Sequence, residues 1–309
     1  MATLTVLGSI NVDHVMQVAA FPRPGQTIEA QHYQVIGGGK GANQAVAAAR
    51  LGGQVAMIGC IGDDPIGAQL TREFAANGLD VSAITTVPGE ATGLAMIYVD
   101  DKGENSIGIW PGANGCLSPQ LALAHRELIE QSQLLLMQLE TPIDTLIEAA
   151  AIAKGANTRV VLNPAPAKAL PEALLHHVDI ITPNETEAEQ LTGIAVNTLT
   201  DADHAAQALH QRFGIDLVLI TMGKRGVWLS QGGQGQLLAG FEVKAVDTTA
   251  AGDTFNGGFV TALLEGQSII DAVAFGQAAA AMSVTRVGAQ SSIPTRDEAQ
   301  ALINTRSSL

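Results

Sequence analysis

The residues best suited to chemistry lie within residues 247–258, which read Asp-Thr-Thr-Ala-Ala-Gly-Asp-Thr-Phe-Asn-Gly-Gly. This stretch combines two carboxylates with a turn of small residues, namely Ala250, Ala251 and Gly252. Small residues leave the backbone N–H groups that open a helix free to point at an anion. A carboxylate beside such a hole can take the proton from a hydroxyl that attacks phosphorus. The stretch therefore predicts phosphoryl transfer with Asp253 as the base, and an ordinary helix N-cap at Asp253 is the alternative.

The composition limits the classes of protein to which this chain can belong. With 309 residues and 47% hydrophobic residues, it is long enough for one large domain or a domain with an appendage. The net charge of -14 argues against nucleic acid or an anionic membrane surface as a partner. Cys60 and Cys116 form neither a disulfide framework nor a zinc-ligand spacing, so we expect buried, reduced thiols.

Residues 1–10 are typical of a first strand and not of a secretory signal, because no basic region precedes a long apolar run. The apolar runs rich in small residues, such as residues 278–281, are too short to span a bilayer. We therefore expect a cytoplasmic protein.

The fold that must position the residues of the 247–258 stretch is indicated by an alternation of short apolar runs and longer helical patterns. Helical patterns at residues 43–51, 65–77 and 142–154 each have a glycine just past the end. Short apolar runs typical of buried strands lie at residues 4–7, 55–58, 134–139, 160–162, 180–181 and 217–220. The alternation predicts an α/β fold with a central, mostly parallel sheet covered by helices on both faces.

Two regions, residues 13–36 and 92–110, break this alternation and are typical of strand pairs without helices. We expect them to form a small β-sheet lid that covers the site, leaving residues 1–12, 37–91 and 111–309 as the main domain. Strands that project from a domain expose edges, so the lid also predicts a homodimer. A hairpin at the edge of the main sheet is the alternative.

Polar residues follow several of the predicted strands at the point where each strand ends. They are Glu140, Asn163, Asn184 and the turn at 221–223. Ligands of open parallel sheets bind beyond the carboxyl ends of the strands, so we expect these residues to converge on one site. Asp13, which we place at the end of the first strand, would accept hydrogen bonds from sugar hydroxyls there.

Residues 37–43, Gly-Gly-Gly-Lys-Gly-Ala-Asn, open a predicted helix but have neither the P-loop order nor the dinucleotide fingerprint. Their glycines allow close approach of a small polyol, with Lys40 and Asn43 as donors; a helix-capping turn is the alternative. Asn184 and Glu187 lie three residues apart at the start of another helix. They predict either outer-shell support of Mg²⁺ or a capping box.

Residues 37–45 and 247–258 resemble the two signature motifs of the ribokinase family of carbohydrate kinases, also called the phosphofructokinase-B family. Residues 8–14, 137–140 and 284–290 are also similar to that family, and the match runs from residue 11 to 294. The resemblance implies a ribokinase-like fold and ATP-dependent phosphorylation of D-ribose at its 5-hydroxyl, giving ribose 5-phosphate and ADP.

The resemblance also implies roles for individual residues. Asp253 would be the base and Ala250, Ala251 and Gly252 the anion hole. The sugar would be held by Asp13, Gly39, Lys40, Asn43, Glu140 and Asp253. The nucleotide would lie against Asn184, Thr221, Gly223, Gly226, Gly252 and Gln277, of which Gln277 stands at a position that varies in the family. Glu187 would support Mg²⁺ through water, and K⁺ would bind, mostly through backbone carbonyls, at Asp247, Thr249, Ser283, Arg286, Gly288 and Ser292.

Other functions remain open at this point. A kinase for deoxyribose, fructose, fructose 6-phosphate or a nucleoside such as adenosine would keep the same machinery. A non-catalytic sugar-binding regulator would be expected to lack the base or the anion turn, and both are present. A nicotinamide dehydrogenase would carry a glycine fingerprint after the first strand, where the chain has Gly-Ser-Ile-Asn instead.

Overall fold

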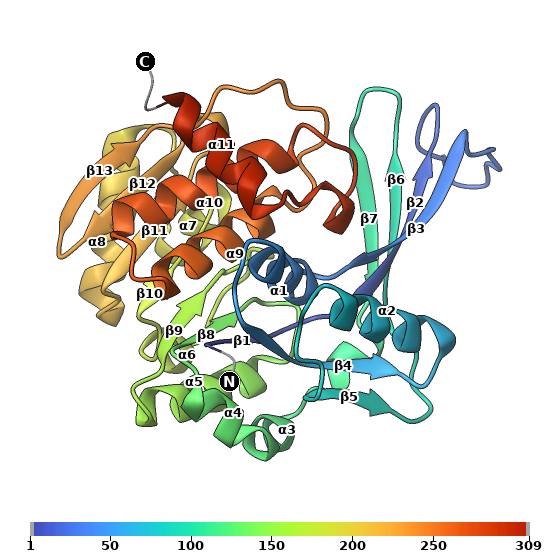
Figure 1. The fold of residues 1–309 in the computed structure, drawn as a ribbon. Helices are drawn as coiled ribbons and strands as arrows, with labels where there is room; N and C mark the ends of the chain where they lie inside the picture. Colours follow the sequence, from blue (N-terminus) through green and yellow to red (C-terminus); the bar gives the residue numbers. More distant parts are fainter. Residues whose placement is uncertain (1–2, 307–309) are drawn as a thin grey trace.

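The structure, a computed structural model, describes residues 3–306. Within that range nine strands form a central sheet in the order β13-β12-β11-β10-β9-β8-β1-β4-β5, in which all pairs are parallel except those that β12 makes with β11 and β13 (Figure 1). Their bounds are β1 (Leu4–Leu7), β4 (Val55–Gly62), β5 (Ile84–Val87), β8 (Leu134–Met137), β9 (Arg159–Leu162), β10 (Ile180–Ile181), β11 (Leu217–Thr221), β12 (Val227–Gln231) and β13 (Gln234–Leu238). The strands predicted from the short apolar runs are confirmed, as is the mostly parallel sheet.

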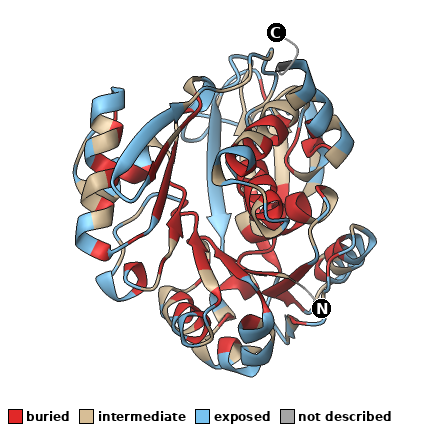
Figure 2. Cartoon of the chain, turned by 60° about the vertical axis from the view of Figure 1, so that its left-hand side comes forward, coloured by how far each residue is buried: buried red, intermediate tan, exposed pale blue. Residues whose placement is uncertain are grey.

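The central strands are short apolar runs because helices bury both of their faces. Leu4 and Val6 of β1 point into one layer and Leu7 into the other, and all three are fully buried. Figure 2 shows buried residues concentrated along the central strands and on the helix faces that cover them. The first layer contains α1 (Lys40–Arg50), α2 (Pro65–Ala76), α9 (Ala251–Leu264), α10 (Ile269–Ser283) and α11 (Arg296–Arg306). The second contains α3 (Pro119–Ala124), α4 (Arg126–Gln131), α5 (Ile143–Gly155), α6 (Glu172–Leu175), α7 (Glu185–Thr192) and α8 (Leu199–Phe213).

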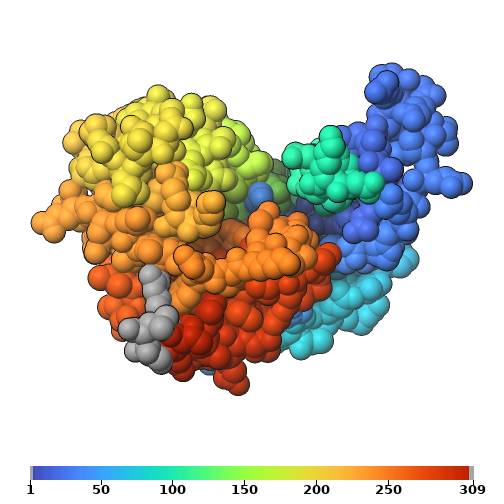
Figure 3. Space-filling view, turned by 90° about the horizontal axis from the view of Figure 1, so that it is seen from above, coloured from blue at the N-terminus to red at the C-terminus, as the bar shows by residue number. Residues whose placement is uncertain are grey.

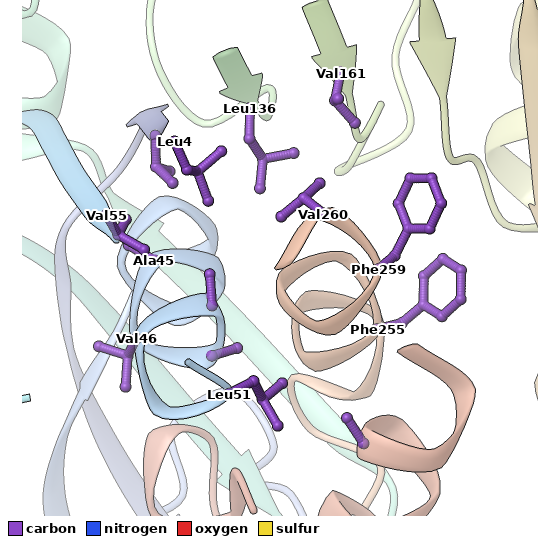
Figure 4. Packing of buried hydrophobic residues seen from close by; sticks show 14 of the residues in the cluster. Leu4, Ala45, Val46, Leu51, Val55, Leu136, Val161, Phe255, Phe259 and Val260 are labelled. Atoms are coloured by element: carbon purple, nitrogen blue, oxygen red, sulfur yellow. The ribbon is translucent and has the colours of Figure 1, made fainter. Parts of the chain in front are cut away.

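Helices α1 and α9 pack side by side under the middle of the sheet. A Cβ at Gly257 would lie 2.5 Å from the Cβ of Ala47, so these helices approach each other where only a hydrogen fits. Around this contact, Figure 4 shows the side chains of Ala45, Val46, Leu51, Phe255, Phe259 and Val260 packed beneath Leu4, Leu136 and Val161. The close packing fixes the start of α1 against the start of α9, where the two sequence motifs lie.

A separate small sheet, with the order β3-β2-β6-β7, projects from the main body (Figure 1). Its strands are β2 (Asn11–Gln17), β3 (His32–Gly38), β6 (Gly93–Val99) and β7 (Asn105–Trp110). We call this sheet the lid. A separate sheet excludes the edge-hairpin alternative, and its strands begin close to the predicted bounds of 13–36 and 92–110.

The sequence prediction was wrong in three details. Asp13 does not follow the first strand, because β1 ends at Leu7 and the chain turns through residues 8–10 into lid strand β2. Gly155 does not follow α5 but is its last residue, and the left-handed backbone belongs to Asn157 at φ 63°. Cys60 is buried as expected, but Cys116 in η1 (Gly112–Cys116) is half-buried.

Residues 1–2 of the expected N-terminal strand lie outside the described residues. Among residues 3–306, no helix combines the length and the apolar character needed to cross a membrane. Two further short helices, η2 (Gly223–Arg225) and η3 (Gln290–Ser292), lie in loops at the carboxyl edge of the sheet and beside α1.

Candidate active site

The first turn of α9 leaves backbone donors free to bind an anion. Ala250 precedes the helix in the left-handed conformation, with φ 57° and ψ 15°. The N–H of Ala251 donates to the Thr248 carbonyl at 3.2 Å, whereas those of Gly252 and Asp253 have no protein acceptor among the described residues. No heavy atom lies within 4 Å of a Cβ built at Gly252, so a ligand can reach these donors. The turn is thus arranged as an anion hole.

Asp253 lies in the first turn of the helix and is not its N-cap, which is Ala250, so the capping alternative for Asp253 is wrong. Its side chain is 6% exposed and lies beside the free N–H groups. Oδ2 accepts a hydrogen bond from Asn43 Nδ2 at 3.0 Å, and Oδ1 accepts one from Gln44 Nε2 at 2.9 Å. Burial raises the pKa of Asp253, while Lys40 and the two amides act in the opposite direction.

The start of α1 brings a cation to this carboxylate. Gly39 precedes the helix with φ 85°, a conformation that favours glycine. Lys40, which follows it, is half-buried among carboxylates. Burial acts to lower the pKa of the Lys40 ammonium, but four carboxylates outweigh it and raise that pKa. They are, in order of effect, Asp253, Glu140, Glu187 and Asp13.

Two further carboxylates complete the cluster. Asp13 reaches it from lid strand β2 and is 7% exposed; burial, Glu140 and Asp253 raise its pKa to about 7. A Cβ at Gly38 would lie 2.2 Å from Oδ2 of Asp13, so the glycine provides the space for this carboxylate. Oε2 of Glu140 accepts hydrogen bonds from the Ser9 hydroxyl at 2.6 Å and the Lys40 N–H at 2.9 Å. Asp13, Lys40 and Glu140 therefore form one polar cluster between lid and main body.

Two cavities meet this cluster, and one of them includes residues of the lid and of the main body, between which Figure 3 shows a hollow. One, of about 220 Å³, contains the anion hole and three of the predicted strand exits; its lining includes Lys40, Asn163, Asn184, Glu187, Thr221, Gly252 and Asp253. The other, of about 370 Å³, contains the fourth exit and the base of the lid; its lining includes Asn11, Ile109, Asn114, Glu140, Thr141 and Lys168. The predicted convergence of strand exits is thus divided between neighbouring cavities.

Asn184 and Glu187 form the capping box of α7, with both hydrogen bonds at 2.8 Å. Oε2 of Glu187 accepts from the Asn184 N–H, and the Asn184 side chain accepts from the Glu187 N–H. Glu187 is 6% exposed and lines the smaller cavity opposite the anion hole. The capping box therefore holds this carboxylate where it could bind the water shell of a cation, so the two alternatives are compatible.

The remaining residues expected at a nucleotide lie around the end of β11. Thr221 lines the smaller cavity. Gly223 and Gly226 bound the turn that follows, and a Cβ at Gly226 would lie 2.1 Å from the Leu238 carbonyl oxygen. Gln277 donates to the same carbonyl at 2.8 Å, and its Oε1 is buried without a hydrogen-bond partner among the described residues. Gln277 therefore supports the wall formed by residues 238–240.

The residues expected around a monovalent cation come from two segments that meet at Asp247. One of its carboxylate oxygens accepts from the Thr249 N–H at 2.9 Å and the other from the Gly288 N–H at 2.8 Å. Burial acts to raise the pKa of Asp247, but these hydrogen bonds outweigh it and lower that pKa. The site therefore keeps an anionic oxygen ligand, which suits a hard cation.

The side chains of the other expected ligands point elsewhere. Ser283 donates to the Ala280 carbonyl at 2.9 Å, Ser292 donates to the Ala289 carbonyl at 2.8 Å, and Arg286 pairs with Glu298. Because these side chains have other partners, the cation ligands expected from these residues stay their backbone carbonyls. Within residues 3–306, no group of three or more His, Cys, Asp or Glu side chains is placed to hold a metal ion.

Sequence reasoning missed several buried polar residues that support the site. Gln44 lies within the first motif, so its position beside Asn43 was an available signal. Ser9, Gln138, Asn256 and the half-buried Gln290 also lie within stretches that resemble the family, but nothing local indicates which partner each side chain contacts.

Known proteins are similar to this chain over nearly its whole length. The family model described as "pfkB family carbohydrate kinase" matches residues 1–296. The chain is 56% identical to the ribokinase of Haemophilus influenzae over 296 residues, covering 96% of each chain. It is 42% identical to the ribokinase of Staphylococcus aureus over 298 residues, covering 96% of this chain and 97% of the relative.

Solved structures are similar over nearly the whole chain. The ribokinase of Thermotoga maritima superposes with a TM-score of 0.90 at 40% identity, covering 98% of this chain and 100% of that one. The Arabidopsis thaliana ribokinase complexed with ribose and ATP superposes with a TM-score of 0.92 at 32% identity, covering 98% of both chains.

Proposed function

The chain belongs to the pfkB family of carbohydrate kinases, and we infer from this membership and from the site that it transfers the γ-phosphoryl group of ATP to the 5-hydroxyl of D-ribose. The observation that carries the inference is the buried Asp253 carboxylate beside two backbone N–H groups that have no acceptor among the described residues. A base and an anion hole on the first turn of one helix are the parts that in-line phosphoryl transfer needs from a protein.

In the proposed reaction Asp253 accepts the proton of the sugar 5-hydroxyl. The oxygen attacks the γ-phosphorus as the bond from that phosphorus to the β–γ bridging oxygen breaks, and ADP leaves. The N–H groups of Gly252 and Asp253 point at the charge that develops on the transferred group. Lys40, whose ammonium faces several carboxylates, adds a positive charge to the same place.

We propose that the sugar lies between the lid and the first turn of α1. Asp13 and Glu140 would accept hydrogen bonds from its hydroxyls, and Asn43 and the backbone at Gly39 and Lys40 would line the opposite side. The burial of Asp13 and the glycine backbone around it support this placement, because a buried carboxylate needs hydrogen-bond donors and a sugar hydroxyl can supply one. A sugar lacking one hydroxyl would leave such a group unpaired, which disfavours deoxyribose.

We place the nucleotide along the smaller cavity. Its phosphates would lie at the first turn of α9, with Asn184 and Thr221 on the opposite wall. The turn at Gly223 and Gly226 and the wall supported by Gln277 would continue toward the base. Mg²⁺ would bind between the phosphates and the water shell held by Glu187, and it supplies charge neutralisation when bound.

We also propose a monovalent cation, K⁺, at Asp247. The donor set fits: one ionised carboxylate and the carbonyls of the two segments that Asp247 joins. The residues involved would be Asp247, Thr249, Ser283, Arg286, Gly288 and Ser292. Because the turn at Thr248 leads directly into the anion hole, a charge there would orient the donors of α9.

The lid supports a proposed homodimer through the face that points away from the sugar. The pairing of the lid strands assigns each side chain to one of two faces. Asp13 and Ile109 share the face toward the sugar, and the other face carries Val12, His14, Met16, Tyr33, Val35 and Trp110. Tyr33, Val35 and Trp110 are 50%, 47% and 60% exposed, so this face presents apolar and aromatic groups to solvent. A second copy of the same sheet would cover them. Because the reaction uses ATP, we propose the cytoplasm as its location.

The first experiment is an ADP-release assay with Mg-ATP on ribose, deoxyribose, fructose, fructose 6-phosphate and adenosine, each with potassium or with sodium. Ribose-dependent turnover that potassium increases is the expected result. Preference for another acceptor would keep the mechanism and refute the specificity. As a matched variant, Asp253→Asn should still bind ribose in calorimetry but lose about 100-fold to 10,000-fold in turnover, and wild-type rates in that variant would exclude the base.

A further inference from the structure

A buried amide outside the substrate cavities holds the Asp253 carboxylate. Gln44 is fully buried and lines neither cavity, yet its Nε2 donates to Oδ1 of Asp253 at 2.9 Å. Asn43, the preceding residue, donates to the other oxygen at 3.0 Å. Asn43 is 6% exposed, whereas Gln44 has no exposed surface and approaches the base from the protein interior. The two amides thus fix the plane of the carboxylate.

The orientation of the Gln44 amide is itself determined by its neighbours. Oε1 accepts from Gln138 Nε2 at 2.6 Å, and Nε2 donates to Oδ1 of Asn163 at 3.0 Å as well as to Asp253. The reversed amide would place Oε1 against two acceptor oxygens. A Cβ at Gly8 would lie 2.1 Å from Oε1 of Gln138, so a glycine makes room for this contact.

The network returns to the anion hole by a second route. Nδ2 of Asn163 donates to the Thr182 carbonyl at 3.0 Å, and the Thr182 hydroxyl donates to Oδ1 of Asn256 at 2.7 Å. Asn256 in turn donates to the Gly252 carbonyl at 2.8 Å. All of these side chains are at most 6% exposed. This network of amides and one hydroxyl therefore joins the exits of three strands to Gly252 and Asp253 of the proposed catalytic turn.

We propose that Gln44 is a positioning residue for the base, held in register by Gln138 and Asn163, and that it keeps Asp253 ionised and oriented for proton transfer. The inference rests on the proposed function of Asp253 and adds a residue that touches neither sugar nor nucleotide. Each carboxylate oxygen uses one acceptor site for an amide and keeps another for the sugar hydroxyl. Buried hydrogen bonds to the charged form favour that form over the protonated one.

Several charged groups that face Asp253 affect its pKa and must be considered in any measurement of the pH dependence. Lys40 of α1 favours the ionised form, whereas Glu140 after β8, Asp13 of the lid and Glu187 of α7 oppose it. Loss of one amide donor also disfavours the ionised form and should therefore raise the pKa of Asp253 further. A hydrogen bond to a charged group corresponds to about one to two pH units, so the acid limb of the rate profile should move upward by that amount.

The variant Gln44→Met keeps the length of the side chain and removes the donor. With Mg-ATP and ribose, its kcat/KM below the acid limb should fall about 10-fold to 100-fold and recover toward wild type on the alkaline plateau. The KM values for ribose and ATP on that plateau should stay unchanged. Gln138→Met, which acts only through Gln44, should give a smaller shift in the same direction and no further shift in the double variant.

The matched control is Thr5→Val, which removes a buried hydrogen bond to Ser132 at 2.7 Å from the same sheet. It should lose stability without moving the acid limb. The proposal is overturned if both glutamine variants keep the wild-type limb, or if their loss is equal at every pH as in a merely destabilised protein. Two further results distinguish a failure of this proposal from a failure of the proposed function. If wild type turns over ribose and Asp253→Asn is inactive, the proposed function holds even when the role of Gln44 is refuted.

Discussion

The raised pKa of Asp13 predicts that the sugar site destabilises the fold at neutral pH. The pKa of its carboxyl is about 7 in the folded protein, against an ordinary value of 3.8. Between those values the folded protein holds a proton that the unfolded chain has released, so stability falls as the pH rises through this window. At 1.36 kcal/mol per pH unit, the difference between the two pKa values corresponds to about 4 kcal/mol. Asp13→Asn cannot titrate and escapes this loss.

The measurement is urea unfolding of both proteins at pH 5 and pH 8. Roughly two pH units separate pH 5 from the pKa of Asp13 in the folded protein, so the advantage of Asp13→Asn over wild type should grow by about 3 kcal/mol between the two conditions. The same substitution should raise the KM for ribose, because the variant lacks an anionic acceptor. Stability and function would then be opposed at one residue.

Asp64→Asn is the control with the opposite sign. Burial acts to raise the pKa of Asp64, but hydrogen bonds from Gly67 and Thr92 outweigh it and lower that pKa. Its stabilising effect is present above the unfolded pKa, so this variant should be less stable than wild type by the same amount at pH 5 and pH 8. A gap between Asp13→Asn and wild type that is also constant would refute the reasoning about Asp13.

Four further substitutions test the cation site, the anion hole, a close backbone contact and the lid. In Asp247→Asn the ratio of the rates in potassium and sodium should fall toward one, and an unchanged ratio would move the cation site elsewhere. Gly252→Ala should keep the wild-type unfolding midpoint, because its Cβ meets no heavy atom within 4 Å, but lose about 100-fold in turnover as the added methyl group displaces the phosphoryl group from its donors. Gly41→Ala should instead lose about 2 kcal/mol or more of stability, since its Cβ would lie 2.6 Å from the Gly8 carbonyl carbon, and a normal midpoint would show that this crossing can relax. Val35→Glu should halve the mass in light scattering, with the fold intact by circular dichroism, and a persistent dimer would place the interface away from this lid face.

The sequence predicts the sheet well because its strands are buried on both faces and their apolar runs are unambiguous. The start of α9 was also predictable, since small residues beside Asp253 have few other uses. The position of Asp13 on a lid strand was not predictable. It depends on the turn at residues 8–10, where Gly8 contacts Gly41 closely, and this contact has no local signature in the sequence. Asn163 was expected at the site as a strand-exit residue, but its contact with Gln44, like that of Gln138, was not predictable because only tertiary packing brings these amides together.

Because side chains alternate along the lid strands, a substitution that affects sugar binding and one that affects assembly fall on opposite faces of the lid. Asp13 and Ile109 lie on the face that we propose for the sugar, and Val35 and Trp110 lie on the face that we propose for the partner. Adjacent positions along each strand alternate between these two faces. Point substitutions can therefore alter acceptor choice or assembly one at a time. Insertion of one residue in β2 would exchange the two faces, because the period of a strand is two residues. We expect relatives of this chain to differ in the lengths of the lid turns more readily than in the lengths of the strands.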